Sequence, residues 1–295
     1  MWPRGGQRGV APEVARKFRA RRAELGLGPV AIHANYLINL GSSDAALWER
    51  SVAAFRDELL RGAALGAEYL IIHPGSARGG EMSQAIENVA AGITRAAKDL
   101  PSGAPRVLLE NTAGQGASVG SRLEELRQIL DICSTRGVAP QPGICLDTAH
   151  LLAAGYEVRT AEGLEATLDA VEQIVGLANV RVIHCNDSKA AFGSRRDRHE
   201  HIGKGHIGLE AFGRILNHPR LQCDGRAFLL ETPIDRPGDD RRNVRALWNL
   251  LGLPVPAVER KKLPRVLTQG PRSRGKVKLR GAVSRARAKS KRRSR

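Results

Sequence analysis

Six short apolar runs in the sequence each end, within a residue, in a side chain that can bind a divalent metal ion. In chain order these side chains are His33, His73, Glu110, Asp147, His184 and Glu231. Imidazole nitrogen and carboxylate oxygen without thiolate form the donor set of catalytic zinc or manganese, which excludes a zinc finger. A single such group at a strand end is often only a cap, but capping does not explain six in succession. The pattern indicates one shared metal site.

Three further metal-binding groups follow two of these runs. His150 lies three residues after Asp147, and the segment His184-Cys-Asn-Asp-Ser-Lys is followed on the same loop by Asp197-Arg-His199. Two other elements, the run from His73 to Ser76 and the run from Glu110 to Gly116, join a metal-binding residue to a glycine turn that lets the backbone approach a phosphate. Metal-binding residues next to phosphate-binding turns predict a metal-dependent reaction of a phosphate ester.

The apolar runs alternate with amphipathic stretches, which is typical of βα units around a parallel sheet. We expect strands at Pro29–His33, Glu68–His73, Arg106–Glu110, Gly143–Asp147, Val180–His184 and Ala227–Glu231. Apolar residues at three- and four-residue spacing predict helices at Pro12–Leu25, Asp44–Leu65, Gly80–Lys98, Ser121–Thr135 and Ala161–Leu177. The carboxyl ends of parallel barrel strands meet at one rim, where active sites are built. The fold predicted is therefore a TIM-type (β/α) barrel with its metal-binding groups on that rim.

Between His33 and Thr232 the sequence resembles endonuclease IV, the second family of apurinic/apyrimidinic endonucleases. The resemblance rests on these segments in the family's order: HANYLINLG from His33, HPGS, ENTAGQG, LDTAH with AAGY from Ala153, HCNDSK, DRH, and LET from Leu230. It implies three zinc ions, with manganese a possible substitute. One would be held by His33, His73 and Glu110, a second by Glu110, Asp147, His184 and Glu231, and a third by His150, Asp197 and His199.

The resemblance also implies a reaction, hydrolysis of the phosphodiester 5′ to an abasic site in double-stranded DNA. The nucleophile would be a metal-bound hydroxide, with Glu110 bridging two ions and Glu231 orienting the hydroxide, and the products a 3′-hydroxyl and a 5′-deoxyribose phosphate. The abasic sugar would swing out of the duplex at low cost because its base is already missing. Tyr36 matches the family's side chain that enters the resulting gap, although it could also be an ordinary rim aromatic.

The sequence departs from the family at both ends. Endonuclease IV has eight strands and we expect six, with the family's first two missing, so that the strands ending in His33 and Glu231 become exposed sheet edges. We expect translation to begin upstream of Met1. Of the 47 Lys and Arg, 16 lie from Arg260 onward with no acidic residue among them. Residues 1–258 are thus predicted as an incomplete endonuclease barrel and 259–295 as a disordered basic tail that binds DNA phosphates or serves no specific role.

Composition sets the remaining expectations. The 295 residues can bury a sizeable core, the four scattered cysteines suggest no disulfide framework, and no run is apolar enough for a membrane helix. We expect a cytoplasmic, nucleoid-associated monomer. Two alternatives stay open: a metal-dependent sugar isomerase or epimerase on a related barrel, and a nucleic-acid-binding protein that has lost activity. The third metal cluster and the basic tail favour the nuclease.

Overall fold

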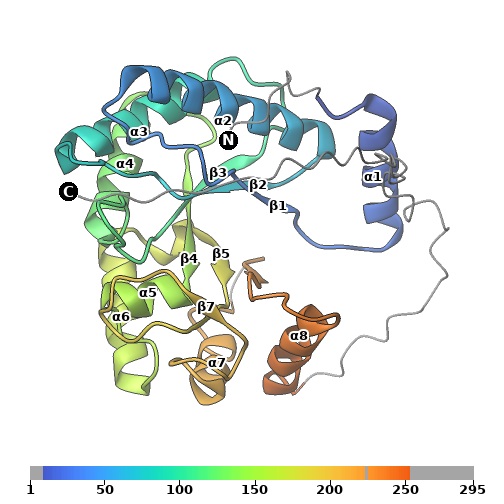
Figure 1. Ribbon diagram of the computed structural model, residues 1–295. Helices are drawn as coiled ribbons and strands as arrows, with labels where there is room; N and C mark the ends of the chain where they lie inside the picture. Colours follow the sequence, from blue (N-terminus) through green and yellow to red (C-terminus); the bar gives the residue numbers. More distant parts are fainter. Residues whose placement is uncertain (1–8, 223–224, 253–295) are drawn as a thin grey trace, which may run out of the picture. The chain divides into compact units, whose positions relative to one another are not determined.

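The computed structural model describes residues 9–222 and 225–252 (Figure 1). Its main sheet contains β1 (Ala31–His33), β2 (Tyr69–Ile72), β3 (Arg106–Glu110), β4 (Gly143–Asp147), β5 (Val180–His184) and β8 (Ala227–Leu229). The helices are α1 (Pro12–Glu24), α2 (Ala45–Leu65), α3 (Met82–Ala97), α4 (Leu123–Thr135), α5 (Thr148–Ala154), α6 (Ala161–Ile174), α7 (Leu209–Leu216), α8 (Asp239–Leu250) and the 3-10 turn η1 (Leu177–Asn179). The predicted basic tail, 259–295, lies outside the described residues and stays a prediction.

The six main strands are all parallel and pair in chain order, β1-β2-β3-β4-β5-β8. The sheet curls into part of a TIM barrel, which confirms the predicted fold class and the six strands expected. Within the described residues β1 and β8 have one neighbour each, so they form the two edges. Three strands are shorter than predicted, with β1 beginning at Ala31, β2 spanning Tyr69–Ile72 and β8 ending at Leu229.

Helices pack in sequence around the outside of the sheet. Contacts join α1 to α2, α2 to α3, α3 to α4, α4 to α6, α6 to α7 and α7 to α8. Local signals set their ends. For example, the Asp44 carboxylate accepts a hydrogen bond from Leu47 N at the start of α2, and Gly66 ends it with φ of 67°. The predicted helix 161–177 stops at Ile174 because Gly176 takes φ of 79° and the chain turns into η1.

Helices α7 and α8 and one hairpin were absent from the predicted elements. Helices α5, α7 and α8 are short, and strands β6 (Asp187–Ser188) and β7 (His199–Glu200) form a two-stranded antiparallel sheet. This hairpin carries the chain from β5 back over the rim. None of the helices in the described part of the chain is long and apolar enough to cross a membrane.

The core has two layers, because side chains along a strand alternate between the two faces of the sheet. The larger layer lies between the sheet and the helices and includes Phe55, Leu109, Ile129 and Phe212. The smaller lies inside the curl and is made by Ile71, Leu108, Cys145 and Val182. On each of these four strands the next inward position, two residues on, is one of His73, Glu110, Asp147 and His184. Apolar side chains thus form the floor on which the polar rim residues stand.

Candidate metal centre

Glu110 lies at the centre of the predicted site, at the end of β3, with none of its surface exposed. Its Oε2 is 2.9 Å from His33 Nε2 and 3.4 Å from His73 Nε2. Its Oε1 is 3.0 Å from His184 Nδ1 and 3.4 Å from His150 Nδ1. A buried carboxylate that faces four imidazoles is placed to bridge cations on both sides.

The first cluster consists of His33, His73 and Glu110, whose ligand atoms all lie within 4.8 Å of one another. His33 Nδ1 donates a hydrogen bond to the Ala34 carbonyl at 2.9 Å, which leaves Nε2 free to face the carboxylate. This fixes the tautomer in the way that metal-binding histidines usually require. The three side chains come from the ends of β1, β2 and β3, as the sequence predicts.

The second cluster brings together Glu110, Asp147, His184 and Glu231 within the same 4.8 Å. His184 Nδ1 lies 3.2 Å from Glu231 Oε2 and 3.8 Å from Asp147 Oδ2. Cys145 Sγ also comes within this distance of Glu110 and His184, and burial raises the pKa of its thiol to about 12.

The third cluster lies on the far side of Asp147. His150 Nε2 and His199 Nε2 are 3.2 Å and 3.5 Å from Asp197 Oδ1, and Asp147 Oδ2 is 3.7 Å from His199 Nε2. The other ring nitrogens of the two histidines donate to backbone carbonyls, His150 Nδ1 to Asn111 O and His199 Nδ1 to Glu231 O. Both Nε2 atoms are buried yet make no hydrogen bond within the described residues. Two such atoms aimed at one carboxylate fit a cation between them.

The buried carboxylates of the three clusters need positive charge close to them. Although burial opposes it, the carboxylates Asp147, Asp197 and Glu110 raise the pKa of His150 well above its usual value. Burial likewise opposes the shift, but the neighbouring His150 imidazole lowers the pKa of Asp197 to about 2. In the metal-free protein, protons on His150 and His184, whose pKa values are both raised, therefore offset the buried carboxylates. A divalent cation would replace those protons, as metal binding generally does.

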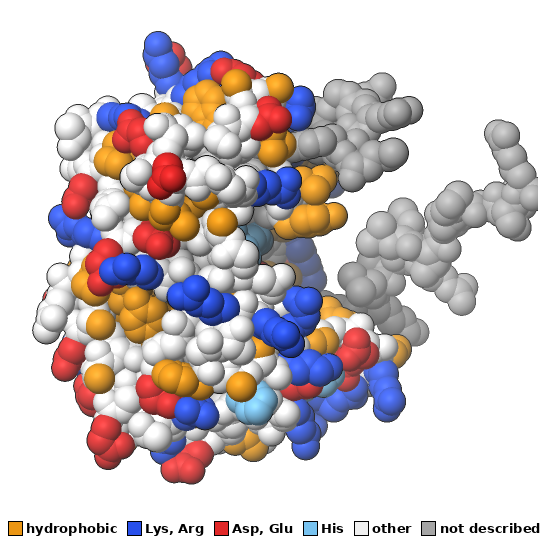
Figure 2. All heavy atoms as spheres, turned by 60° about the vertical axis from the view of Figure 1, so that its left-hand side comes forward, with side chains coloured by type: hydrophobic (Ala, Val, Ile, Leu, Met, Phe, Trp, Pro, Cys, Tyr) orange, Lys and Arg blue, Asp and Glu red, His pale blue; other side chains and the backbone are white. Residues whose placement is uncertain are grey.

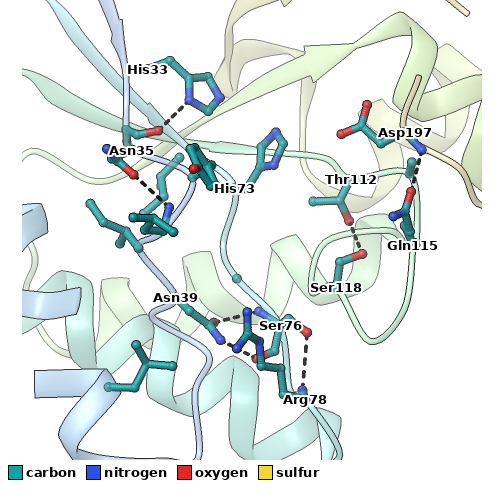
Figure 3. Close-up of a pocket in the computed structure, with 18 of the residues that line it drawn as sticks. His33, Asn35, Asn39, His73, Ser76, Arg78, Thr112, Gln115, Ser118 and Asp197 are labelled. Atoms are coloured by element: carbon teal, nitrogen blue, oxygen red, sulfur yellow. Dashed lines mark hydrogen bonds between the residues drawn. The ribbon is translucent and has the colours of Figure 1, made fainter. Parts of the chain in front are cut away.

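A cavity of about 520 Å³ opens beside the first cluster (Figure 3). The rim loops that follow β1, β2 and β3 line it, and Asp197 and Arg198 join them from the loop before β7. In this close-up His33 and His73 lie at one side of the cavity and Asp197 at the other. Tyr36 also lines the cavity, and 87% of its side chain is exposed. The side chain that is predicted to enter DNA is thus exposed to a duplex that approaches this rim.

Sequence reasoning missed a set of buried polar residues that hold the rim in place. Asn111 Oδ1 accepts a hydrogen bond from Asp147 N at 2.7 Å, which ties the ends of β3 and β4 together. The fully buried Asp187 accepts from the backbone N–H groups of Gly203, Gly205 and Ile207, and so pins the loop that follows β7. Their only signal in the sequence was their position beside predicted ligands.

Lys and Arg side chains occupy the surface beside a recessed histidine in Figure 2. Arg78 and Arg198 lie at the mouth of the cavity itself. A rim that is basic while its floor is acidic and histidine-rich suits a polyanion that approaches a metal centre.

The fold and the rim clusters define a class, a TIM barrel with metal-binding groups at the carboxyl ends of its strands. The family model described as a xylose isomerase-like TIM barrel matches residues 2–250. Probable endonuclease 4 of Solibacter usitatus is 52% identical over 240 residues, 81% of this chain and 82% of the relative. That of Methanoculleus marisnigri is 42% identical over 251 residues, covering 85% and 87% of the two chains.

Among solved structures, endonuclease IV from Thermus thermophilus matches with a TM-score of 0.71 and 41% identity over 83% of this chain and 84% of that one. The chain belongs to the endonuclease IV family. A D-tagatose 3-epimerase-like protein shares the fold, with a TM-score of 0.61 at 19% identity over 82% and 84% of the chains. That second likeness concerns the barrel alone.

Proposed function

We propose that this protein is a DNA repair endonuclease that hydrolyses the phosphodiester 5′ to abasic sites in double-stranded DNA. The products would be a 3′-hydroxyl and a 5′-deoxyribose phosphate. The observation that supports this most directly is the meeting of nine His, Asp and Glu side chains, Glu110 among them, in three adjoining clusters of a chain whose relatives are endonucleases.

The residues present fit three zinc ions, with manganese a possible substitute. The first cluster would hold one ion, the second would share Glu110 with it, and His150, Asp197 and His199 would hold the third. When bound, closely spaced zinc ions lower the pKa of water and offset the charge of a phosphodiester. The two orphaned Nε2 atoms of His150 and His199 are the strongest support for the third site.

The chain's own side chains would divide the remaining work. Glu110 keeps the first two clusters at a fixed separation, because each of its oxygens faces a different pair of histidines. Glu231, partly exposed beyond the end of the β8 edge, would accept a hydrogen bond from the attacking water and orient it. Tyr36 would enter the duplex where the base is missing, at the point where unpairing costs least.

A cleavage assay tests the proposal. Purified protein, stripped of metal and then reloaded with zinc, is incubated with a duplex that carries one abasic site and with an intact duplex of the same sequence. We expect 5′ incision of the first duplex only, loss of incision in the stripped protein, and recovery on reloading. His150→Ala should abolish recovery, whereas His218→Ala, which removes a largely buried histidine that is paired with Glu165 and belongs to none of the three clusters, should leave incision unchanged. Turnover of monosaccharides with no incision would overturn the proposal in favour of an isomerase.

The basic tail would add affinity for DNA without taking part in the chemistry, in a cytoplasmic, nucleoid-associated monomer. Each phosphate contact makes the logarithm of affinity fall with the logarithm of salt concentration, with a slope of about −0.9 per neutralised phosphate. Removing residues 260–295 should flatten this slope by several units and leave the incision rate at saturating DNA unchanged. Equal slopes for the two proteins would show that the tail makes no phosphate contacts.

A further inference from the structure

Asn186 is a fully buried amide two residues after the end of β5, and it contacts two different strand ends. Its Nδ2 donates a hydrogen bond to Asp147 Oδ2 at 2.5 Å, at the end of β4. Its Oδ1 accepts one from Glu231 N at 2.7 Å, beyond the end of β8. It therefore links β4 to β8 across the intervening strand.

The backbone of Asn186 is fixed as firmly as its side chain. Its N–H donates to Thr148 Oγ1 at 3.0 Å, and its carbonyl accepts from the same hydroxyl at 2.7 Å. Thr148 is itself buried at the start of α5. The amide plane consequently has one orientation, and the positions of its donor and acceptor are set by the fold.

The bond to Asp147 determines how that carboxylate faces the site. The other oxygen, Oδ1, accepts from His150 N at 2.8 Å as the N-cap of α5. With both oxygens held, the carboxylate cannot rotate, and Oδ2 faces both His184 and His199. A neutral amide does this without adding charge, so the carboxylate's own charge stays available to a cation.

The bond to Glu231 acts where strand pairing ends. Strand β8 ends at Leu229, whose carbonyl accepts a hydrogen bond from Cys185 N at 2.7 Å. Within the described residues, no strand-to-strand backbone hydrogen bond holds the two residues that follow. Asn186 Oδ1 extends the attachment to Glu231. On an edge strand this side-chain bond takes the place of a backbone bond.

We infer that Asn186 is a positioning residue that holds Asp147 and Glu231 at the separation the second cluster needs. This inference rests on the proposed metal-dependent function. Only an amide suits the position, because one face must donate to a carboxylate while the other accepts from a backbone N–H. Asparagine provides both at a fixed spacing, and neither Asp nor Leu does.

The test compares the zinc affinities of metal-stripped proteins, measured by competition with a chromogenic chelator and without DNA. Asn186→Asp keeps the shape and the acceptor but places a second carboxylate against Asp147. Changes to groups that orient metal ligands typically weaken metal binding by about 10- to 100-fold, and we expect a loss of that size for one zinc ion. For incision of abasic DNA we expect the kcat of the variant to fall. Its KM should stay at the wild-type value, because the rim and the tail govern DNA binding.

Asn88→Asp is the matched control. Asn88 is a half-buried amide on α3 that donates to Ser42 O and accepts from Gln84 Nε2, away from all three clusters. The same chemical change there should leave zinc affinity and kcat at wild-type values. If Asn186→Asp fails to fold by circular dichroism, Asn186→Ala carries the test, because it removes the amide without adding charge.

Wild-type zinc affinity in a folded Asn186 variant would overturn the positioning role. Failure of the wild-type protein itself to bind zinc would instead refute the proposed function. The two failures are therefore distinguishable in a single titration series.

Discussion

The middle of the sheet and its two edges supply metal-binding groups of different character. Glu110, Asp147 and His184, from β3, β4 and β5, are at most 2% exposed. His33, His73 and Glu231, from the ends of β1, β2 and β8, keep 31%, 40% and 33% of their side-chain surface exposed. The ligands of β3, β4 and β5 are therefore enclosed, whereas those at or next to the edges of the sheet are partly exposed.

Strands β1 and β8 have a paired strand on one side only, whereas β3, β4 and β5 are paired on both sides. Between β3 and β4 the amide of Asn111 adds a side-chain bond to the backbone ladder. At β8 the ladder ends before Glu231, and Asn186 supplies the missing attachment. At the β8 edge a side-chain bond therefore replaces strand pairing, whereas between β3 and β4 a side-chain bond supplements it.

The largest effect is expected at the centre. Glu110→Gln keeps the shape but removes the charge that faces four histidines, so both of the first two clusters should lose their cation. We expect incision to fall by more than the roughly 100-fold seen when only supporting residues are changed. Zinc content should drop by at least two ions per chain, as measured by atomic absorption. A folded variant that keeps all its zinc would contradict the bridging role of Glu110.

The apolar residues beneath the metal clusters allow the middle of the sheet and its edge to be compared in their contribution to stability. Leu108 on β3 is fully buried, whereas Leu229 on the β8 edge is only half-buried. Leu108→Ala should lower the free energy of unfolding by about 2–5 kcal/mol, because it leaves a cavity in close-packed surroundings. Leu229→Ala should cost only about 1 kcal/mol, in proportion to the area it buries. Urea denaturation measures both, and equal losses would show that the edge is packed as tightly as the middle.

The smallest effect concerns the β1 edge and its dependence on pH. Glu68 accepts hydrogen bonds from Arg22 Nη2 at 2.6 Å and Val30 N at 2.8 Å, joining α1 to the segment before β1. Burial opposes the shift, but the bond from Arg22 lowers the pKa of Glu68 below its usual value. A lowered folded-state pKa stabilises the protein above the unfolded-state value, and the contribution is lost as pH falls through the folded-state pKa.

Glu68→Gln should therefore destabilise the protein near pH 7 by less than about 1 kcal/mol, since the pair is partly solvated. The difference between variant and wild type should vanish below the folded-state pKa of Glu68. Denaturation midpoints across a pH series measure it. Arg127→Gln, which breaks an exposed pair within α4, is the control away from the edge.

Much of the fold could be predicted because its signals are local. The six strands and the helices from α1 to α4 were located within a few residues, since apolar periodicity and capping residues act over a few positions. Helices α7 and α8 and the β6-β7 hairpin were missed. The two hairpin strands have only two residues each, and contacts with distant parts of the chain stabilise these elements, as when Asn243 of α8 accepts a hydrogen bond from Ile202 N.

The sequence alone determined which residue types end the strands, and the parallel βα order required those ends to share one rim. It could not determine which atom of each side chain faces its neighbour, because that depends on backbone groups far away in the chain. The tertiary structure decided that His150 turns Nδ1 to Asn111 O and leaves Nε2 for Asp197. It also gave Asn186 its two partners, Asp147 and Glu231, 39 and 45 residues away.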